Sequence, residues 1–533
     1  MRDSIDLQVA QTESALNKPV AQRALGRQLV HNSAATVALY VITLLVAVWY
    51  TPFTVRHLGI SLQAVVQLAA SFVFYLSFAT TGVCGSVGRL VMADAARGDM
   101  QAANRTFNTF LIAAERIALI LLGIIGLIVV FVVPRFDYPP GLLGTTRFLF
   151  AAVLGSTVIQ LFGMCFDSAI WVSGRIDIRS IILTIEILVR SGTVFLLFNT
   201  SSPSLVHIGI AILVAPLVSL ALYYVTWRKF TPELTINRKY FDASRFKEIR
   251  GQGGWLLVFQ IGTTLQFNAD LFLLNLLLGS QIQGSYGLLV TWCNIFRGLF
   301  GSMASLLATS LVAFQASDDR AKLVDLALKG VRIQGMLIAI PIGVLCGLAG
   351  PALRWWVGPE FMFLAPVAWL ILVPLALEGS FNPVLVVIQA PGVIDFSAKA
   401  AVAMGIVNIA LGIILVKFAG LGMYGVALAV ASTSVLRHGI VLPIYAARVM
   451  GQPWYLIVQQ QAQIVIQLAV TGVLALYAAQ FLHTRSFAQL LLAAVASGSI
   501  ASLVAILQLN ADERNRILAI RYYSSVLLAA DHG

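Results

Sequence analysis

A carboxylate interrupts a long apolar stretch in the second half of the chain. Glu378 lies in PVAWLILVPLALEGSFNPVLVVIQA, residues 366–390, between Pro374 and Pro383. Proline has no backbone N–H, so each proline frees a carbonyl in the preceding helical turn. Helices broken in this way are tolerated within a membrane where they line a cavity. Two interpretations stay open. Glu378, with Asn382 nearby, exchanges a proton or cation and acts in coupling or gating, or it is a kink residue paired to a neighbouring helix.

A second apolar segment carries a polar stripe. Gln260, Thr263, Gln266 and Asp270 fall within about 120° of one another around a helix. An ionisable residue at the bilayer centre costs at least about 2.5 kcal/mol on insertion scales, so Asp270 needs a polar partner or an aqueous surface. The stripe is either a hydrogen-bonded seam between helices or a cavity wall that faces a substrate or a coupling ion.

Arg297 lies in an otherwise apolar segment, with Asn294 one turn before it. A guanidinium binds a carboxylate or phosphate group through two parallel N–H bonds, which makes Arg297, with Asn294, a candidate for binding an anionic substrate. The alternative, which the spacing leaves equally open, is that Arg297 neutralises Asp270 or Glu378.

Two further arginines lie within or near the ends of apolar segments. Arg190 follows Glu186 by four residues, a spacing that puts both side chains on one helix face and favours an internal ion pair. Arg437 precedes His438 near a segment end or a helix seam, where snorkelling to the interface or helix pairing is expected. Both arginines, with Gln266, are kept as candidates for contacting a substrate.

Membrane-spanning helices must position these residues. Of the 533 residues, 59% are hydrophobic and only 11% are charged, against about 25% charged in soluble domains. Apolar runs of about 20 residues, the length that crosses a bilayer, recur along the chain. The sequence predicts an all-α polytopic membrane protein of about fourteen transmembrane helices, near 33–55, 62–88, 108–133, 146–172, 181–199, 206–226, 255–278, 286–312, 332–352, 362–389, 397–416, 423–446, 461–482 and 488–509.

The distribution of Lys and Arg predicts the orientation. With the N-terminus inside, 25 of the 35 basic residues fall in inner loops and tails, six in outer loops and four within spans. The positive-inside rule therefore predicts that both termini are cytoplasmic and that the chain lies in the inner membrane of the cell. The same bias accounts for most of the net charge of +12, so nucleic-acid binding is not expected.

The longest hydrophilic segment, 227–254, divides the chain into similar halves. HLGISLQ at 57–63 resembles LLGSQIQ at 277–283, and HIGIA at 207–211 resembles MYGVA at 423–427. The offsets of 220 and 216 residues agree closely, and an even number of spans separates the matched positions, so the repeat is parallel. Parallel bundles related by an axis along the membrane normal are a transporter design, with a central cavity where the halves meet.

The domain organisation follows from this division. We expect a tail, a first six-helix bundle, a basic linker with an interfacial helix capped by Asp242, a second six-helix bundle, two additional helices and a C-terminal tail, at 1–31, 32–226, 227–254, 255–450, 451–510 and 511–533.

The motifs do not indicate catalysis. The patterns G-x-x-x-x-G-K-[ST] and H-E-x-x-H do not occur, and the six histidines are scattered. The four cysteines lie in apolar segments without paired spacing, which predicts neither a disulfide framework nor a metal site. We expect no catalytic residue, no metal and no cofactor, with a proton or sodium ion as the coupling ion.

Five stretches, in order and at the appropriate spans, carry a family resemblance: TPFTVRHLG, GRLVMADAARGDMQAANRTFNTF, FNADLFLLNLLLGSQIQGSYG, RWWVGPEF and GLGMYGVALA. Over about residues 30–450 the chain resembles the multidrug/oligosaccharidyl-lipid/polysaccharide exporter superfamily, and within it the bacterial polysaccharide flippases of the O-antigen type. Two features depart from that branch. The first Leu-Gly pair lacks a following Tyr-Gly, and fourteen spans exceed the twelve common there, although lipid II flippases have fourteen.

The resemblance implies a substrate and partners. The substrate would be a polyprenyl-diphosphate-linked oligosaccharide moved from the inner to the outer leaflet, as in lipopolysaccharide or exopolysaccharide synthesis. Membrane lipids, a polysaccharide polymerase and glycosyltransferases would be its partners. One alternative is a cation-coupled multidrug exporter of the same superfamily, for which an acidic cavity is expected. The other is a membrane-embedded glycosyltransferase or polymerase, which would need a large outer loop or a cluster of carboxylates.

Overall fold

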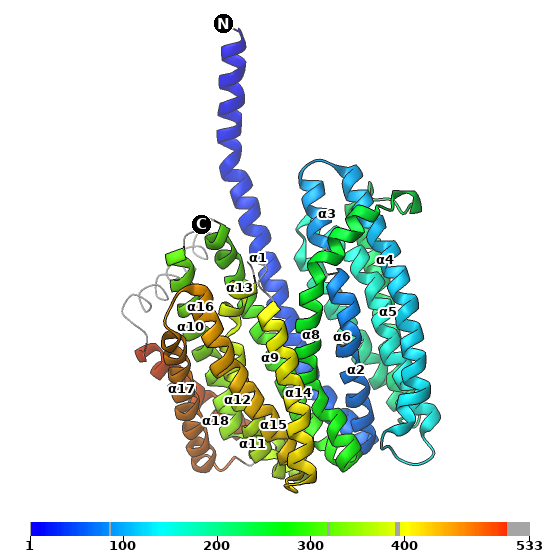
Figure 1. Cartoon of the computed structure of the whole chain (residues 1–533), viewed down its shortest axis with the longest axis vertical. Coiled ribbons are helices and arrows are strands. Elements are labelled where there is room, and N and C mark those ends of the chain that lie inside the picture. The colour runs from blue at the N-terminus through cyan, green and yellow to red at the C-terminus, as the bar shows by residue number, and fades with distance from the viewer. Residues whose placement is uncertain (1, 85–86, 317–319, 390–394, 485, 509–533) are drawn as a thin grey trace. The chain divides into compact units, whose positions relative to one another are not determined.

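The computed structural model describes residues 2–84, 87–316, 320–389, 395–484 and 486–508, and some side chains within these ranges, such as 2–27, 247–254 and 304–310, are not described. The predicted C-terminal tail therefore lies outside the described residues. Every element in the described ranges is a helix (Figure 1). The α-helices are α1 (Arg2–Leu58), α2 (Ile60–Cys84), α3 (Val87–Ala96), α4 (Met100–Leu127), α5 (Leu143–Ser173), α6 (Ile176–Thr200), α7 (Leu205–Phe230), α8 (Ala243–Leu278), α9 (Ser280–Ala316), α10 (Arg320–Gly347), α11 (Ala349–Trp356), α12 (Ala365–Ser380), α13 (Asn382–Gln389), α14 (Asp395–Lys417), α15 (Gly422–Leu436), α16 (Leu442–Met450), α17 (Trp454–Phe481) and α18 (Phe487–Gln508). Short π or 3-10 segments are η1 (Ile128–Val132), η2 (Val133–Arg135), η3 (Arg238–Tyr240), η4 (Pro359–Leu364) and η5 (Arg437–Val441).

Twelve helical segments among the described residues are long and apolar enough to cross a membrane. They are His31–Leu58, Met100–Arg135, Leu143–Ser173, Ile176–Thr200, Leu205–Phe230, Leu257–Leu278, Ala321–Gly347, Pro359–Ser380, Asp395–Lys417, Gly422–Met450, Trp454–Phe481 and Phe487–Gln508. The two other predicted spans correspond to α2, whose described apolar part is Ile60–Leu76, and to α9. The polytopic all-α class predicted from composition is confirmed.

Several helix boundaries differ from the prediction. The residues before the first span are helical and continuous with it in α1, since this segment is rich in Ala, Gln and Leu, which favour helix. The helix predicted after Asp242 is also not separate, because α8 continues from Ala243 into the next span. The predicted span 362–389 is divided into α12 and α13 at Phe381, as its two prolines indicate.

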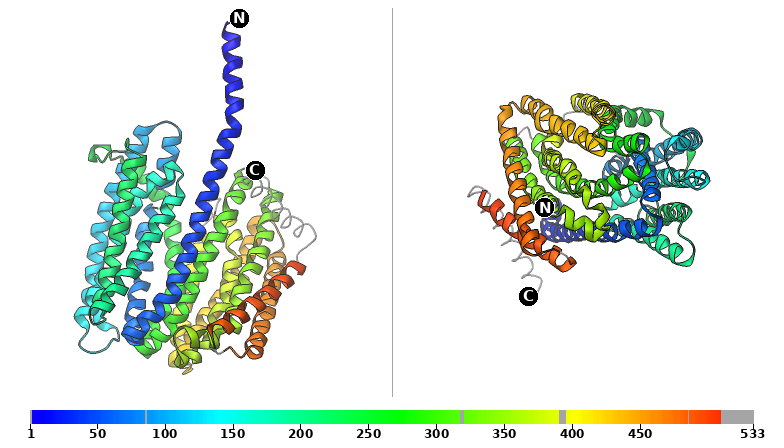
Figure 2. Two further views of the ribbon diagram at one scale, coloured as in Figure 1. Left: turned by 180° about the vertical axis from the view of Figure 1, so that it is seen from behind. Right: turned by 90° about the horizontal axis from the view of Figure 1, so that it is seen from below.

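The chain divides into two compact units, Met1–Leu257 and Val258–Gly533. The division falls just after the predicted linker. Within the first unit α3, α4 and α5 lie side by side, and within the second unit α17 lies beside α18 (Figures 1 and 2).

The two Leu-Gly pairs of the sequence repeat adopt the same local structure, one in each unit. Gly59 and Gly279 have φ of 77° and 86°, a left-handed conformation that glycine adopts without steric cost. Each ends one helix, and its carbonyl then accepts the N–H of Gln63 or Gln283 at 3.1 Å in the next helix. The two Leu-Gly pairs therefore share a local backbone structure, and the relation between the two predicted bundles stays a prediction.

The first half of the linker is bound to α4 within the first unit. Asn104 donates to the Glu233 carbonyl at 2.9 Å and accepts the Thr235 N–H at 2.8 Å. One turn later, Asn108 donates to the Thr235 carbonyl at 2.8 Å and accepts the Asn237 N–H at 2.7 Å. Two amides at i and i+4 thus satisfy four backbone groups of an irregular segment, which explains how it keeps a defined course.

The irregular part of the linker ends at Asp242, which caps the start of α8. The Asp242 carboxylate accepts the N–H of Ser244 at 2.9 Å and the Ser244 hydroxyl, as predicted for an N-cap. These hydrogen bonds, first the one from the Ser244 hydroxyl, hold the pKa of Asp242 below its usual value. The α8 N-terminus is therefore capped by a charged carboxylate.

The second unit is held together by close helix approaches at glycines. A Cβ on Gly343 would lie 2.7 Å from Thr471 Cβ, and one on Gly347 would lie 2.5 Å from the Gly472 carbonyl oxygen. Glycine thus lets the backbones of α10 and α17 pack directly, as small residues do in membrane helix pairs. The first of the two additional helices is consequently an integral part of this unit.

Candidate functional site

Arg297 and Glu378 form an ion pair between α9 and α12. Arg297 Nε donates to Glu378 Oε1 at 3.0 Å and Nη2 donates to Oε2 at 3.4 Å, a two-point contact between fork and carboxylate. The side chains are 25% and 16% exposed, so the pair is mostly buried. The Arg297 guanidinium also lies over the Phe267 ring, 4.1 Å from its centroid. Of the predicted roles for Arg297, neutralisation of Glu378 is the one that the structure shows.

The break between α12 and α13 lies next to this pair. In a continuous helix the Gly379 carbonyl would accept the N–H of residue 383, but that residue is Pro383. A backbone N–H at the end of α12 donates to the Gly379 carbonyl, and Gln334 of α10 adds a second donor, with Nε2 at 3.0 Å from the Gly379 oxygen. Gly379 also lacks a side chain where Phe300 of α9 approaches, since a Cβ would lie 2.5 Å from the ring. This close approach lets α9 and α12 bring Arg297 and Glu378 together.

Arg437 is buried, with only 1% of its surface exposed. Its Nη1 donates to Gln266 Oε1 of α8 at 2.6 Å, and its guanidinium lies 5.4 Å from the centroid of Phe259. Asn408 of α14 donates to the Gln266 carbonyl at 3.1 Å. Glycine contacts between α8 and α14, such as Gly405 against Leu265, allow this approach. Arg437 therefore pairs with another helix and does not snorkel.

The backbone at Arg437 forms a π-turn, η5. The Leu442 N–H donates to the Arg437 carbonyl, and the following residue, Pro443, has no N–H. The His438 carbonyl is thereby left without a helical donor, and Gln461 Nε2 of α17 donates to it at 2.8 Å. The site thus has a second break at a proline, and here too a glutamine from a neighbouring helix donates to the carbonyl that has lost its α-helical donor.

Asp270 is 4% exposed and accepts the Tyr286 hydroxyl at 3.2 Å. Gln266, on the same stripe, is fully buried, whereas Gln260 and Thr263 are half-buried, and Thr263 donates to the Gln260 carbonyl of its own helix. Gln266 and Asp270 therefore form an interhelical seam. We call Asp270, Arg297, Glu378 and Arg437 the buried charge cluster of the second unit.

Three candidates lie apart from these contacts. Asn294 is exposed and Asn382 is half-buried. Arg190 belongs to the first unit and is exposed, and within the described side chains it forms no ion pair with Glu186, contrary to the prediction. The Glu186 carboxylate faces α5 instead, where Gln160 Nε2 donates to it at 3.5 Å.

The first unit contains a charged group that the sequence analysis did not select. Asp167 of α5 is 7% exposed, pairs with Arg179 of α6 at 3.4 Å and accepts the Trp171 indole N–H at 3.2 Å. The missed signal is an aspartate in the apolar stretch 146–172. Gln334 and Gln461 were missed because an uncharged amide in a helix gives no comparable signal.

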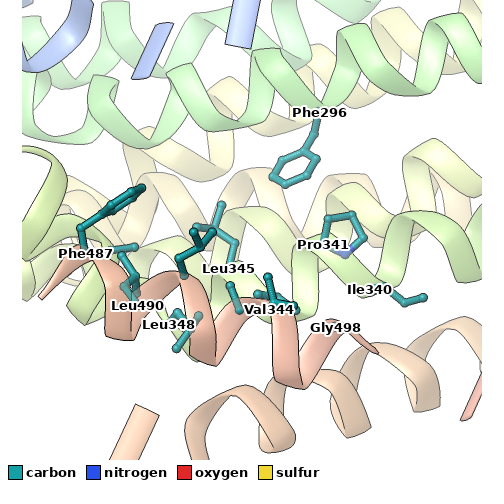
Figure 3. Close-up of a pocket in the computed structure, with 13 residues that line it drawn as sticks. Phe296, Ile340, Pro341, Val344, Leu345, Leu348, Phe487, Leu490 and Gly498 are labelled. Carbon is teal, nitrogen blue, oxygen red and sulfur yellow. The ribbon is translucent and has the colours of Figure 1, made fainter. Parts of the chain in front are cut away.

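An apolar groove of about 530 Å³ lies in the second unit (Figure 3). Phe296 of α9 faces Pro341 and Leu345 of α10 across it, and α18 contributes a wall from Phe487 to Gly498. Because its lining residues are apolar, the groove offers no hydrogen bonds to a sugar, whereas a hydrocarbon chain would be compatible with it.

Comparison with known proteins was made by sequence and by fold. No family model matches the chain. The chain is 31% identical over 422 residues to a protein of Bacillus subtilis (strain 168) described as the uncharacterized membrane protein EpsK, and the match covers 79% of this chain and 83% of EpsK.

Solved structures share the fold. An inward-facing multidrug resistance MATE family transporter of the MOP superfamily matches 80% of this chain and 98% of its own, with a TM-score of 0.63 and 14% identity. The lipid II flippase MurJ in an inward closed conformation matches 89% of this chain and 98% of its own, with a TM-score of 0.64 and 16% identity.

Proposed function

The chain belongs to the family of the membrane protein EpsK, within the multidrug/oligosaccharidyl-lipid/polysaccharide exporter superfamily, and we propose that it is a flippase for a polyprenyl-diphosphate-linked oligosaccharide. It would move this repeat unit from the inner to the outer leaflet of the cytoplasmic membrane by alternating access. The proposal places both termini in the cytoplasm. Its partners would be membrane lipids and the glycosyltransferases and polymerase that make and use the repeat unit.

The observation that carries the proposal is the buried charge cluster. It contains two guanidiniums, and Arg297 presents its fork to a carboxylate in the geometry that also suits a phosphate. Glu378 accepts both hydrogen bonds from this guanidinium in the structure. A diphosphate that binds Arg297 would displace Glu378, which would then take up a proton or a sodium ion. Loss of the substrate on the other side would restore the ion pair and reset the carrier.

Two further observations support a lipid-linked substrate. The MurJ structure, described as a lipid II flippase, has the same fold. The apolar groove between α9, α10 and α18 has the chemistry of a surface for a hydrocarbon chain. Another solved structure with this fold is described as a multidrug resistance transporter, so a cation-coupled drug exporter is the second candidate function. A site with carboxylates alone would favour that candidate. The cluster also contains Arg297, 25% exposed, and Arg437, 1% exposed, and these two cations favour an anionic substrate.

Surface glycan in cells tests the proposal. Arg297→Ala should abolish surface glycan while the protein still accumulates in the membrane, because the diphosphate loses its ligand. Glu378→Gln should slow export and weaken its dependence on pH, since an amide does not exchange a proton. Both variants must be compared at equal protein levels, because an unpaired buried charge also destabilises the fold. Full export by both variants at normal levels would refute the proposed roles.

A further inference from the structure

Two helix breaks in the second unit each deprive one buried carbonyl of its α-helical donor. Gly379 loses this donor because the residue four positions later is Pro383, and a backbone N–H at the end of α12 donates to its carbonyl instead. His438 loses its donor because the Leu442 N–H is used by the Arg437 carbonyl and Pro443 has no N–H. Both carbonyls lie within one residue of a member of the buried charge cluster. The position of Glu378 and Arg437 thus depends on how these breaks are completed.

Each break is completed by a glutamine from another helix. Gln334 of α10 donates to Gly379 at 3.0 Å, and Gln461 of α17 donates to His438 at 2.8 Å. The glutamines are only 3% and 4% exposed, so each bond is made within the protein interior. A buried carbonyl must find a partner. Gln461 provides it for His438, whereas Gln334 adds a second donor to the backbone N–H that Gly379 accepts.

The two glutamines come from one closely packed helix pair. Gly335, the residue after Gln334, leaves no room for a Cβ against Ile464 of α17, and Gly343 and Gly347 approach the same helix further along. Because the pair packs backbone to backbone, the two side-chain amides are held by a common support. Helix α17 lies outside the sequence repeat, and it contributes to the site through the hydrogen bond from Gln461 to His438.

We propose that α10 and α17 form a brace for the transport site, with Gln334 and Gln461 as positioning residues for Glu378 and Arg437. This inference rests on the proposed function, because the residues that it positions are those assigned to substrate binding and coupling. Neither glutamine contacts the substrate. Each fixes the break in the backbone from which a charged side chain projects, and the additional helix α17 is thereby required for transport.

A matched pair of variants separates positioning from stability. Gln461→Leu removes the donor to His438. Gln467→Leu, in the same helix, removes an equally buried bond of the same kind, from Nε2 to the Ala501 carbonyl of α18 at 2.8 Å. Both should lower the melting temperature of the purified protein to a similar extent. Transport of the lipid-linked glycan per folded protein should fall about 10-fold to 100-fold for Gln461→Leu, as expected for a misplaced site residue, and stay near wild type for Gln467→Leu.

The second part of the experiment restores a backbone N–H donor for the His438 carbonyl. Pro443→Ala supplies an N–H five residues after His438, the spacing of a π-turn, so it should rescue both the melting temperature and the transport of Gln461→Leu. Equal transport loss in Gln461→Leu and Gln467→Leu, or no rescue by Pro443→Ala, would overturn the brace. If wild-type protein moves no lipid-linked glycan, the proposed function fails, and rescue of the melting temperature alone then decides whether Gln461 completes the break.

Discussion

The ion pair between Arg297 and Glu378 gives a quantitative prediction through a double-mutant cycle. Arg297→Leu and Glu378→Leu each leave one charge without its partner, whereas the double variant leaves neither. Breaking a fully buried pair costs about 3–5 kcal/mol, and exposed pairs are worth up to about 1 kcal/mol. At 25% and 16% exposure, with one contact at 3.0 Å and one at 3.4 Å, this pair lies between these limits.

We therefore expect each single variant to lose about 2 kcal/mol of the free energy of unfolding, and the double variant to lose about the same amount, a coupling of about 2 kcal/mol. The assay is unfolding of the purified protein in mixed micelles, followed by tryptophan fluorescence. Asp325 and Lys329, an exposed pair at 2.7 Å in the same unit, provide the control. Their coupling should be no more than about 0.5 kcal/mol.

Additive losses in the free energy of unfolding would refute the proposed interaction between Arg297 and Glu378. If the loss in the double variant equals the sum of the two single losses to within about 0.5 kcal/mol, the side chains do not interact in solution. Glu378 would then have no counter-ion to exchange, and the proposed reset of the carrier would lose its basis.

Three other predictions concern the linker, the packing of α10 against α17, and the membrane topology. The double variant Asn104→Ala, Asn108→Ala removes four hydrogen bonds between α4 and the linker, so trypsin should cleave after Lys239 faster than in wild type. An unchanged cleavage rate would show that these hydrogen bonds do not hold the linker in place. Gly347→Leu should prevent α10 and α17 from packing and lower the melting temperature strongly, because its Cβ would meet the Gly472 backbone at 2.5 Å; a wild-type melting temperature would contradict this packing. Lys239→Cys should resist a membrane-impermeant thiol reagent in intact cells, since the charge bias predicts a cytoplasmic linker, and strong labelling would reverse the topology.

The sequence was most informative where one physical property dominates. The length of the apolar runs predicted the membrane-spanning helices, because a helix needs about 20 apolar residues to cross a bilayer. The prolines around Glu378 predicted the break between α12 and α13, since the missing N–H is a property of the residue itself. The Leu-Gly pairs predicted the repeat because the left-handed turns at Gly59 and Gly279 favour glycine.

Tertiary partners were the part that sequence did not provide. Arg297 had two plausible carboxylate partners, and the structure pairs it with Glu378, where α9 and α12 approach closely at Gly379. Glu186 and Arg190 have ideal spacing, yet Glu186 turns toward Gln160 on another helix. Local spacing shows which contacts are allowed, whereas the neighbouring helices decide which are made.

Reconstituted transport tests the central claim most directly. Purified protein in proteoliposomes should be given a fluorescent polyprenyl-diphosphate oligosaccharide and, separately, a cationic dye, each with and without a proton or sodium gradient. The account predicts that the glycolipid changes leaflet, that Arg297→Ala prevents this, and that the dye is not accumulated. Gradient-driven accumulation of the dye, with the glycolipid remaining in its original leaflet, would contradict the account and establish the drug-export alternative.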